Sequence, residues 1–258
     1  MKLLFFLLLF FVNDTVSSQS ILTALNFGTK KEFFSDKLVL ETTTNTTFYN
    51  SNSIEKKKDI TIYNQQNKII SELRYDENGT LKQRLTRTFD STGRKSIARK
   101  FENWHPSIGY FYETAYHGYD SSGFLNSIIE KDQNNTIIRQ TNIINNEKGY
   151  PIELTIYVGN QIYGKEFAEY NYEKNEVIIK YFNKNNELVN SVSSKIEFTK
   201  SEPGDIVNEY GDIIKSKNFE MEIKYDKYGN WIKQVYSTIT NGKLVKKSEF
   251  TRKIKYRK

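Results

Sequence analysis

The two histidines, His105 and His117, are the residues of this 258-residue chain best suited to acid–base or metal chemistry. Imidazole titrates near neutral pH and is a common metal ligand. The two flank a predicted hairpin, so they could approach each other across paired strands. A catalytic zinc needs three protein ligands, however, and two histidines at this spacing form no ligand motif. We therefore expect ordinary loop and surface histidines, with no catalytic residue, no metal site and no cofactor.

A dense run of aromatic residues surrounds these histidines. If Tyr110, Tyr112 and Tyr116 share an exposed strand face, they form a platform that can stack on sugar rings or hold a peptide. The alternative is cross-strand aromatic packing within the sheet. The segment is the candidate ligand-binding site of the chain, and its candidate residues are Trp104, His105, Tyr110, Tyr112, Tyr116 and His117.

Other sources of chemistry find little support in the sequence. The chain has no cysteine, which excludes disulfides, thiolate metal sites and cysteine nucleophiles. It has no Gly-rich phosphate loop and no Ser-centred elbow. Turn carboxylates such as Asp76 and Asp226 could bind calcium, but calcium needs six to eight oxygens, and each turn offers one or two carboxylates. Turn formation explains these residues fully.

The net charge of +7 is concentrated near the carboxyl end. There Glu249 is the only acidic residue among eight cationic ones: Lys243, Lys246, Lys247, Arg252, Lys253, Lys255, Arg257 and Lys258. One interpretation is a patch for an anionic surface, such as envelope polysaccharide, lipid headgroups or nucleic acid. The other, which we favour, is an edge strand that lysines protect from pairing with another molecule.

A recurring turn motif predicts the architecture. An aromatic or apolar residue precedes Asp or Asn, two variable residues follow, and then Gly or Asn, as in 75–79 and 225–229. Asp or Asn at the first position bonds back to the backbone, and Gly or Asn takes the left-handed conformation. Between the turns the sequence alternates with period two, as where Phe219, Met221 and Ile223 alternate with charged residues. No segment of ten or more residues shows a helical period.

We therefore predict an all-β fold, an antiparallel meander of roughly 12–15 strands in a curled or barrel-like single sheet. Three segments are expected: a signal peptide at 1–18, a partly ordered lead-in and polar linker at 19–54, and an antiparallel β-repeat domain at 55–258. Lys2, the apolar run 3–12 and the small residues 16–18 are typical of a secretion signal cleaved near Ser18-Gln19. The apolar run is too short to span a membrane, and no later segment comes close.

The motifs Tyr75-Asp76…Gly79, Phe89-Asp90…Gly93, Tyr119-Asp120…Gly123 and Tyr225-Asp226…Gly229 resemble the YD repeat of Rhs and teneurin-type proteins. In that family, strand–turn units wind into long β-sheet shells, so the resemblance implies a curling antiparallel sheet. The chain is much shorter than a complete shell and lacks the family's Pro-flanked autoproteolytic segment and toxin tail, so the encapsulating function does not carry over.

The sequence thus predicts an exported protein that is secreted, periplasmic or associated with the cell envelope. Its expected role is a non-catalytic binding or scaffold module whose partner is polysaccharide, peptide or another envelope protein. Nucleic acid is not an expected partner, and the oligomeric state is left open. One alternative is an enzyme acting on an extracellular or envelope polymer, with its site near residues 104–120. Another is a component of a toxin or contact-dependent system.

Overall fold

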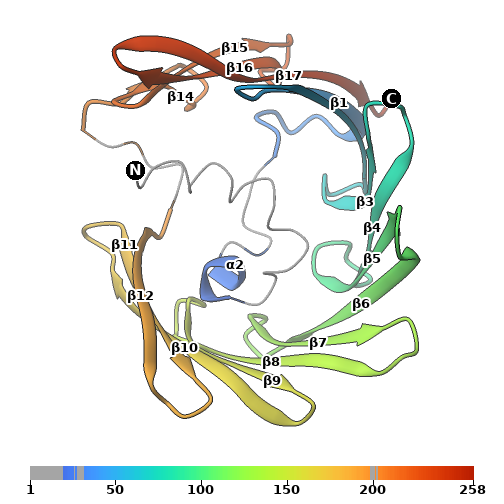
Figure 1. The fold of residues 1–258 in the computed structure, drawn as a ribbon, viewed down its shortest axis with the longest axis vertical. Coiled ribbons are helices and arrows are strands. Elements are labelled where there is room, and N and C mark those ends of the chain that lie inside the picture. The colour runs from blue at the N-terminus through green and yellow to red at the C-terminus, as the bar shows by residue number, and fades with distance from the viewer. Residues whose placement is uncertain (1–19, 26, 28–31, 198–200, 202) are drawn as a thin grey trace. The chain divides into compact units, whose positions relative to one another are not determined.

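The computed structural model describes residues 20–25, 27, 32–197, 201 and 203–258. Within these residues the elements are one five-residue helix and seventeen strands, and every strand pairing is antiparallel (Figure 1). The predicted all-β meander is confirmed. The elements are α2 (Ile21–Leu25), β1 (Val39–Tyr49), β2 (Ile54–Tyr63), β3 (Ile69–Tyr75), β4 (Leu81–Phe89), β5 (Ser96–His105), β6 (Gly109–Tyr119), β7 (Leu125–Asp132), β8 (Ile137–Asn145), β9 (Pro151–Val158), β10 (Gln161–Asn171), β11 (Glu176–Asn183), β12 (Leu188–Lys195), β13 (Ile206–Val207), β14 (Ile213–Ser216), β15 (Phe219–Tyr225), β16 (Trp231–Thr240) and β17 (Lys243–Tyr256).

The chain divides into two compact units, which are described separately. Of the described residues, unit 1 comprises 20–25, 27 and 115–197, and unit 2 comprises 32–114, 201 and 203–258. In unit 1 the strands from β7 to β12 form one sheet in which each strand pairs with its neighbours in sequence. The division itself falls inside β6.

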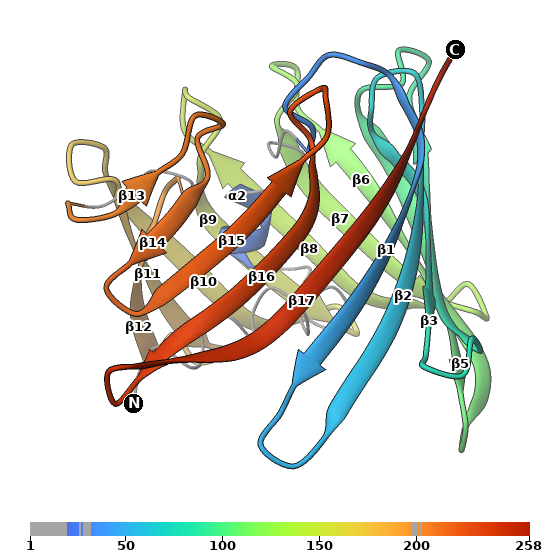
Figure 2. The same ribbon diagram turned by 90° about the horizontal axis from the view of Figure 1, so that it is seen from above.

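The sheet of unit 2 contains one departure from sequence order. The strands run β13-β14-β15-β16-β17-β1-β2-β3-β4-β5, so β1 lies between β17 and β2 (Figure 2). Strand β1 is thus an interior strand, although it lies within the segment 19–54 that was predicted as a lead-in and polar linker. Its threonines are β-branched and fit a pleated strand, which the polar composition concealed.

The position of β17 contradicts the prediction that the basic carboxyl-terminal strand is an edge strand. It pairs with β16 on one side and with β1 on the other. The strand count also exceeds the predicted 12–15, because β1 and the short strands β13 and β14 add to the meander. The predicted signal peptide, residues 1–18, lies outside the described residues.

The hairpin turns confirm the motif read from the sequence. In the turn at Asp76, the Asp76 N–H donates to the carbonyl of Thr80, and the Asp76 carboxylate accepts the N–H groups of Asn78 and Thr80 at 3.0 and 2.9 Å. Gly79 there has φ +76°, the left-handed conformation that closes the turn and shifts the strand register by one residue. The same bond between the first-position N–H and the carbonyl that closes the turn recurs at Asn64, Asp90, Asp120, Asp132, Asn146, Asn183, Asn208 and Asp226.

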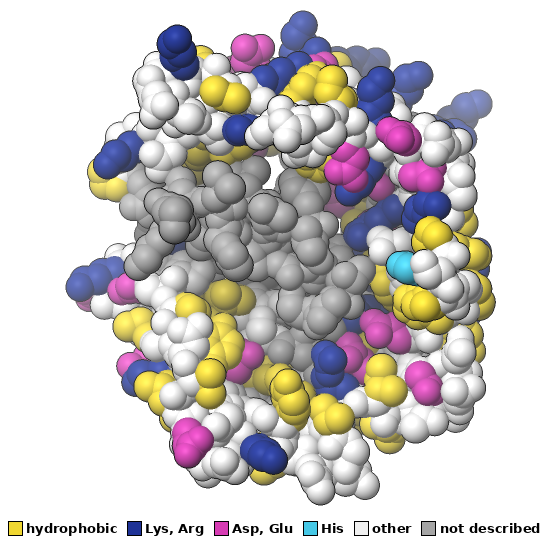
Figure 3. Space-filling model, in the orientation of Figure 1, with side chains coloured by type: hydrophobic (Ala, Val, Ile, Leu, Met, Phe, Trp, Pro, Cys, Tyr) yellow, Lys and Arg dark blue, Asp and Glu magenta, His cyan; other side chains and the backbone are white. Residues whose placement is uncertain are grey.

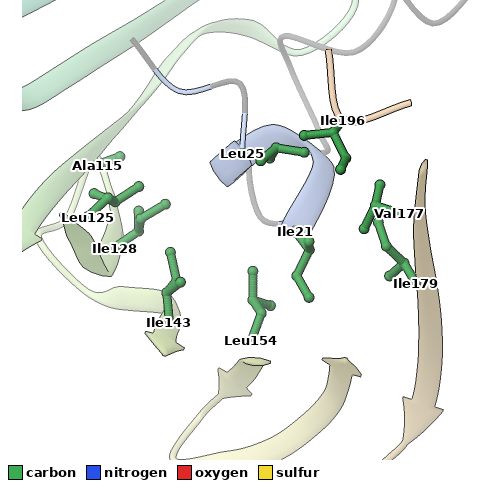
Figure 4. Packing of buried hydrophobic residues seen from close by; sticks show 10 residues of the cluster. All are labelled: Ile21, Leu25, Ala115, Leu125, Ile128, Ile143, Leu154, Val177, Ile179 and Ile196. Atoms are coloured by element: carbon green, nitrogen blue, oxygen red, sulfur yellow. The ribbon is translucent and has the colours of Figure 1, made fainter. Parts of the chain in front are cut away.

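Unit 1 buries an aliphatic core. The helix α2 presents Ile21 and Leu25 to the sheet, and Ile21 points toward Leu154 of β9 (Figure 4). Leu154, Val177 and Ile179 are completely buried. The core residues are Ile21, Leu25, Ala115, Leu125, Ile128, Ile143, Leu154, Val177, Ile179 and Ile196.

Unit 2 buries a more polar set of side chains. Tyr63 is completely buried, and its hydroxyl donates to the Glu32 carboxylate at 2.6 Å. Asn230, only 1% exposed, accepts the Phe34 N–H at 2.8 Å and donates to the Tyr256 hydroxyl at 2.8 Å. These bonds attach the segment before β1 to the sheet.

Candidate functional site

The predicted aromatic segment does form a hairpin, and its unit 2 part carries a cluster of aromatic and charged side chains. Lys100, Glu102 and Trp104 alternate along β5, so they share one face of the sheet. The register of β4 and β5 places Arg84 directly opposite Glu102 on that face. We call the cluster the aromatic patch, and it consists of Arg84, Lys100, Glu102, Trp104, Tyr110 and Tyr112.

Glu102 organises the aromatic patch. Its side chain is 3% exposed, and the Arg84 guanidinium donates to both of its oxygens, at 2.5 and 2.7 Å. The Tyr110 hydroxyl donates to Oε1 at 2.8 Å, and the Lys100 ammonium lies 3.4 Å away. The Arg84 hydrogen bonds, with support from Tyr110 and Lys100, lower the pKa of Glu102 to about 2 although burial opposes the shift. Glu102 is therefore ionised at neutral pH and fixes the Tyr110 ring.

The aromatic rings of the patch form a short row. The ring centroids of Trp104 and Tyr110 lie 5.3 Å apart, and those of Tyr110 and Tyr112 lie 6.1 Å apart. Cations accompany both ends, since the Lys100 ammonium lies 3.9 Å from the Tyr112 ring and the Arg84 guanidinium lies 5.7 Å from Trp104. Tyr110, in the middle, is 45% exposed. The rings therefore pack on each other, and Tyr110 still reaches solvent.

Three candidate residues, His105, Tyr116 and His117, lie outside the aromatic patch. His105 ends β5, and its Nδ1 accepts the Ser107 N–H at 3.2 Å, which is a turn contact. Tyr116 and His117 belong to unit 1. Tyr116 is 46% exposed beneath the Lys131 ammonium, whereas His117 is 9% exposed and packs edge-on against Phe27 with ring centroids 4.9 Å apart. All three tyrosines of the predicted platform lie on β6, with Tyr110 and Tyr112 in unit 2 and Tyr116 in unit 1.

Sequence reasoning missed three members of the patch: Arg84, Lys100 and Glu102. The period of two along β5 would have grouped Lys100, Glu102 and Trp104, had charged residues been considered together with aromatic ones. Arg84 could not have been found in this way, because its place opposite Glu102 depends on the register between β4 and β5.

The chemistry of the aromatic patch is set by an ionised carboxylate and a row of aromatic rings. Its carboxylate is fully engaged by Arg84 and Tyr110, which removes it as a proton donor near neutral pH. Among the residues that the structure describes, no group of three or more His, Asp or Glu side chains could hold a metal ion. Aromatic rings flanked by ammonium and guanidinium groups instead provide stacking surfaces and positive charge.

Two carboxylates outside the patch have raised pKa values. Burial raises the pKa of Asp59 in unit 2 to about 6, against the opposing charge of Arg74. In unit 1 burial raises the pKa of Glu166 to about 7, although Glu166 accepts the Ile21 N–H at 2.8 Å. Glu166 is buried and Asp59 is half-buried, and neither contributes to the aromatic patch.

Comparisons with known proteins give no family for this chain. No family model and no curated protein matches it. Among solved structures, a porin-like protein from Bacteroides uniformis is similar at 10% identity and a TM-score of 0.46, over 84% of this chain and 96% of that one. A TcdB2-TccC3 structure lacking its hypervariable C-terminal region has a TM-score of 0.19 at 8% identity, over 80% of this chain and 16% of that one. The Pseudomonas aeruginosa MucA/MucB complex has a TM-score of 0.17 at 10% identity, over 91% and 93%.

At these scores the similarities support no functional argument. Among the described residues, the structure contains no helix of the length and apolar character needed to cross a membrane.

Proposed function

We propose that this chain is a non-catalytic binding module of the bacterial cell envelope that holds carbohydrate on the aromatic patch. The observation that carries the proposal is the row of Trp104, Tyr110 and Tyr112 on one end of the unit 2 sheet. Aromatic faces stack on the apolar faces of sugar rings, and such rings are amphipathic enough to remain partly exposed.

The support of the row by charged side chains favours a binding role. The Tyr110 ring is held by its hydrogen bond to Glu102, and Lys100 lies over Tyr112. A side chain fixed before the ligand arrives loses less conformational entropy on binding. The patch also sits on paired strands rather than on a mobile loop, which gives its rings a defined spacing.

The proposed location rests on the sequence. The apolar run at 3–12 followed by small residues is the reason to propose export, with the protein secreted, periplasmic or bound to the envelope. The regular Asx turns support a resemblance to YD repeats at the level of the strand–turn unit, and we propose no toxin function from it.

The test is a glycan-binding screen of the purified protein that includes neutral and acidic polysaccharides and peptidoglycan. The double variant Trp104→Ala/Tyr112→Ala should weaken glycan binding at least tenfold, since each stacked ring contributes on the order of 1 kcal/mol. The control is Tyr163→Ala in unit 1, an aromatic side chain that is 69% exposed and outside the patch. It should change the Kd by less than twofold.

Thermal unfolding of both variants separates loss of binding from loss of folding. Glycan binding that survives in the folded double variant contradicts the proposal, and so does a screen in which no glycan binds the parent protein.

A further inference from the structure

Lysine side chains cluster on the exposed face of the unit 2 sheet that also carries the aromatic patch. We call this cluster the basic face. Strand registers place its members on one side of β15, β16, β17 and β2, and they are Lys56, Lys58, Lys224, Lys233, Lys253 and Lys255. One row crosses five strands, with Lys224 opposite Lys233, then Thr251, Asn45 and Lys58.

The alternation of burial confirms which side faces solvent. Along β17, Thr251, Lys253 and Lys255 are exposed, whereas Ser248 and Arg252 between and before them are buried. Figure 3 shows Lys and Arg side chains projecting along the edge where Figure 1 labels β15, β16 and β17. The lysines therefore extend into solvent from the middle of a sheet.

Edge protection does not explain these lysines. An edge strand uses lysine to prevent pairing with another molecule, but β17 pairs on both sides. The same is true of β2, which lies between β1 and β3.

Acidic side chains on the same face neutralise only part of this charge. The Glu249 carboxylate accepts hydrogen bonds from the ammonium groups of Lys233, at 2.7 Å, and of Lys246. These bonds lower the pKa of Glu249 to about 2. Glu41 lies opposite Lys255 in the register, Glu220 pairs with Lys215 at 2.5 Å, and Glu222 lies on β15.

Four lysines of the basic face stay uncompensated. Within the part of the chain that the structure describes, Lys56, Lys58, Lys224 and Lys253 form no ion pair with a carboxylate. Positive charge is thus in excess here, and it attracts anions at distances up to about 10 Å at 0.1 M salt.

The basic face and the aromatic patch are connected across the sheet. A single cross-strand row leads from Lys253 through Thr43, Ile60 and Leu73 to Arg84 and Glu102. Six strands at a spacing of about 4.8 Å span roughly 24 Å. A neighbouring row between the two surfaces contributes the hydroxyls of Ser71 and Thr86.

We infer that the ligand of this sheet face is an acidic polysaccharide, which stacks on the aromatic patch and extends over the basic face. The inference rests on the proposed function and names its substrate class. Hydroxyl and amide side chains between the charges match sugar hydroxyls, and spaced ammonium groups match carboxylates or sulfates carried on successive sugars.

Nucleic acid fits this face less well. Its dense phosphates favour arginine, whose planar guanidinium binds phosphate oxygens in pairs. The basic face offers lysines only, at a density reduced by the neighbouring glutamates.

The experiment measures binding of the purified protein to polygalacturonate, a carboxylate polysaccharide, and to dextran, a neutral one. We expect polygalacturonate to bind at least tenfold more tightly than dextran at about 50 mM salt, with the preference shrinking as salt rises. The variant Lys58→Gln/Lys224→Gln/Lys253→Gln should reduce this preference to less than threefold while leaving dextran binding unchanged.

The control variant, Lys174→Gln/Lys184→Gln/Lys217→Gln, removes the same charge from exposed turn lysines outside the basic face and should keep the preference. Equal binding of both polysaccharides, or equal effects of the two triple variants, overturns the inference. So does tighter binding of a single-stranded DNA oligonucleotide or of phosphatidylglycerol vesicles than of polygalacturonate.

The two proposals fail in different ways. If dextran binding depends on Trp104 and Tyr112 but polygalacturonate binds no more tightly than dextran, the proposal of carbohydrate binding stands and the proposal of an acidic ligand is wrong. If polygalacturonate binding depends on the lysines but not on the two rings, the acidic ligand stands and the aromatic patch is not its platform.

Discussion

The two units of this chain share one hairpin repeat but bury different chemistry. In unit 1 the core cluster is aliphatic, with Leu154, Val177 and Ile179 packed with the helix α2, although the unit also buries Glu166. In unit 2 the buried face includes Tyr63, Asn230 and Arg252. The turn motif fixes where strands reverse, and the side chains between turns decide what kind of core results.

The difference is one of how stability is obtained. Aliphatic burial is non-directional and gains about 25 cal/mol per Å². A polar core contributes only if its hydrogen bonds are made, because an unpaired buried group costs about 1–3 kcal/mol. In unit 2 the Arg252 Nε–H donates to the Trp231 carbonyl at 3.0 Å, and the guanidinium lies 3.8 Å from the Trp231 ring, whereas its Nη2 finds no hydrogen-bond acceptor among the described residues. The contribution of this polar core therefore depends on which of its hydrogen bonds are made.

The largest expected effect is in the aliphatic core. Leu154→Ala should lower the free energy of unfolding by about 3 to 4 kcal/mol, because Leu154 is completely buried against Ile21 and Ile143 and the cavity cannot collapse fully. Chemical denaturation measures the change, and hydrogen exchange should show it first in the amides of β8, β9 and β10.

The matched change in unit 2 is Tyr63→Phe, which removes only a hydroxyl from an equally buried ring. It should cost about 1 kcal/mol, since Glu32 is part-exposed and can turn to water. If Tyr63→Phe destabilises as much as Leu154→Ala, the distinction between the two cores is wrong.

A pH-dependent effect should distinguish the buried acids of the two units. Burial raises the pKa of Glu166 from 4.5 to about 7, so the folded state binds the proton more tightly than the unfolded chain. Its contribution to stability is therefore complete below pH 4.5 and is lost as the pH rises through 7. Between pH 4.5 and 8, Glu166→Gln should gain about 2 to 3 kcal/mol relative to the parent, as measured by urea unfolding at each pH.

Glu102 in unit 2 should behave in the opposite direction. Because its pKa is lowered to about 2, its contribution is present above pH 4.5 and is lost as the pH falls toward 2. Glu102→Gln should thus destabilise most at neutral pH. The same sign of pH dependence in both variants would contradict the assigned shifts.

The turns of the two units offer a further comparison. Gly79→Ala should cost about 1 kcal/mol, because φ is +76° and nothing lies within 4 Å of the added methyl group. Gly149→Ala in unit 1 should cost more, since the methyl group would lie 2.3 Å from the Phe124 ring. Thermal unfolding of both variants tests which substitution costs more stability. Equal losses of stability would show that backbone strain, and not the contact with Phe124, determines the cost.

Local chemistry was readable from the sequence. The turns at Asp76 and Asp226 could be predicted because an Asx turn depends only on neighbouring residues. The all-β class followed from period-two alternation between such turns. These features require no knowledge of which strands pair.

Long-range pairing was not readable. The Thr-rich stretch that forms β1 lacks the apolar alternation of a half-buried strand, and its partner β17 lies about 200 residues away. The basic strand was misplaced at an edge for the same reason. In the candidate site, Trp104 and Tyr110 were found from composition, whereas Arg84 required a register that no local pattern encodes.

The interior place of β1 has a consequence for how the molecule is made. Most of unit 1 comes from the continuous stretch that begins at Ala115, so its sheet can assemble as soon as that stretch has been synthesised. Strand β1 is synthesised much earlier than its partner β17, which is about 200 residues further along the chain. Until β17 has been synthesised, one edge of β1 is unpaired and can pair with strands of other molecules. Pairing of β1 with β17 must also overcome the entropy of closing a very long loop. Chaperone protection would matter most for this strand.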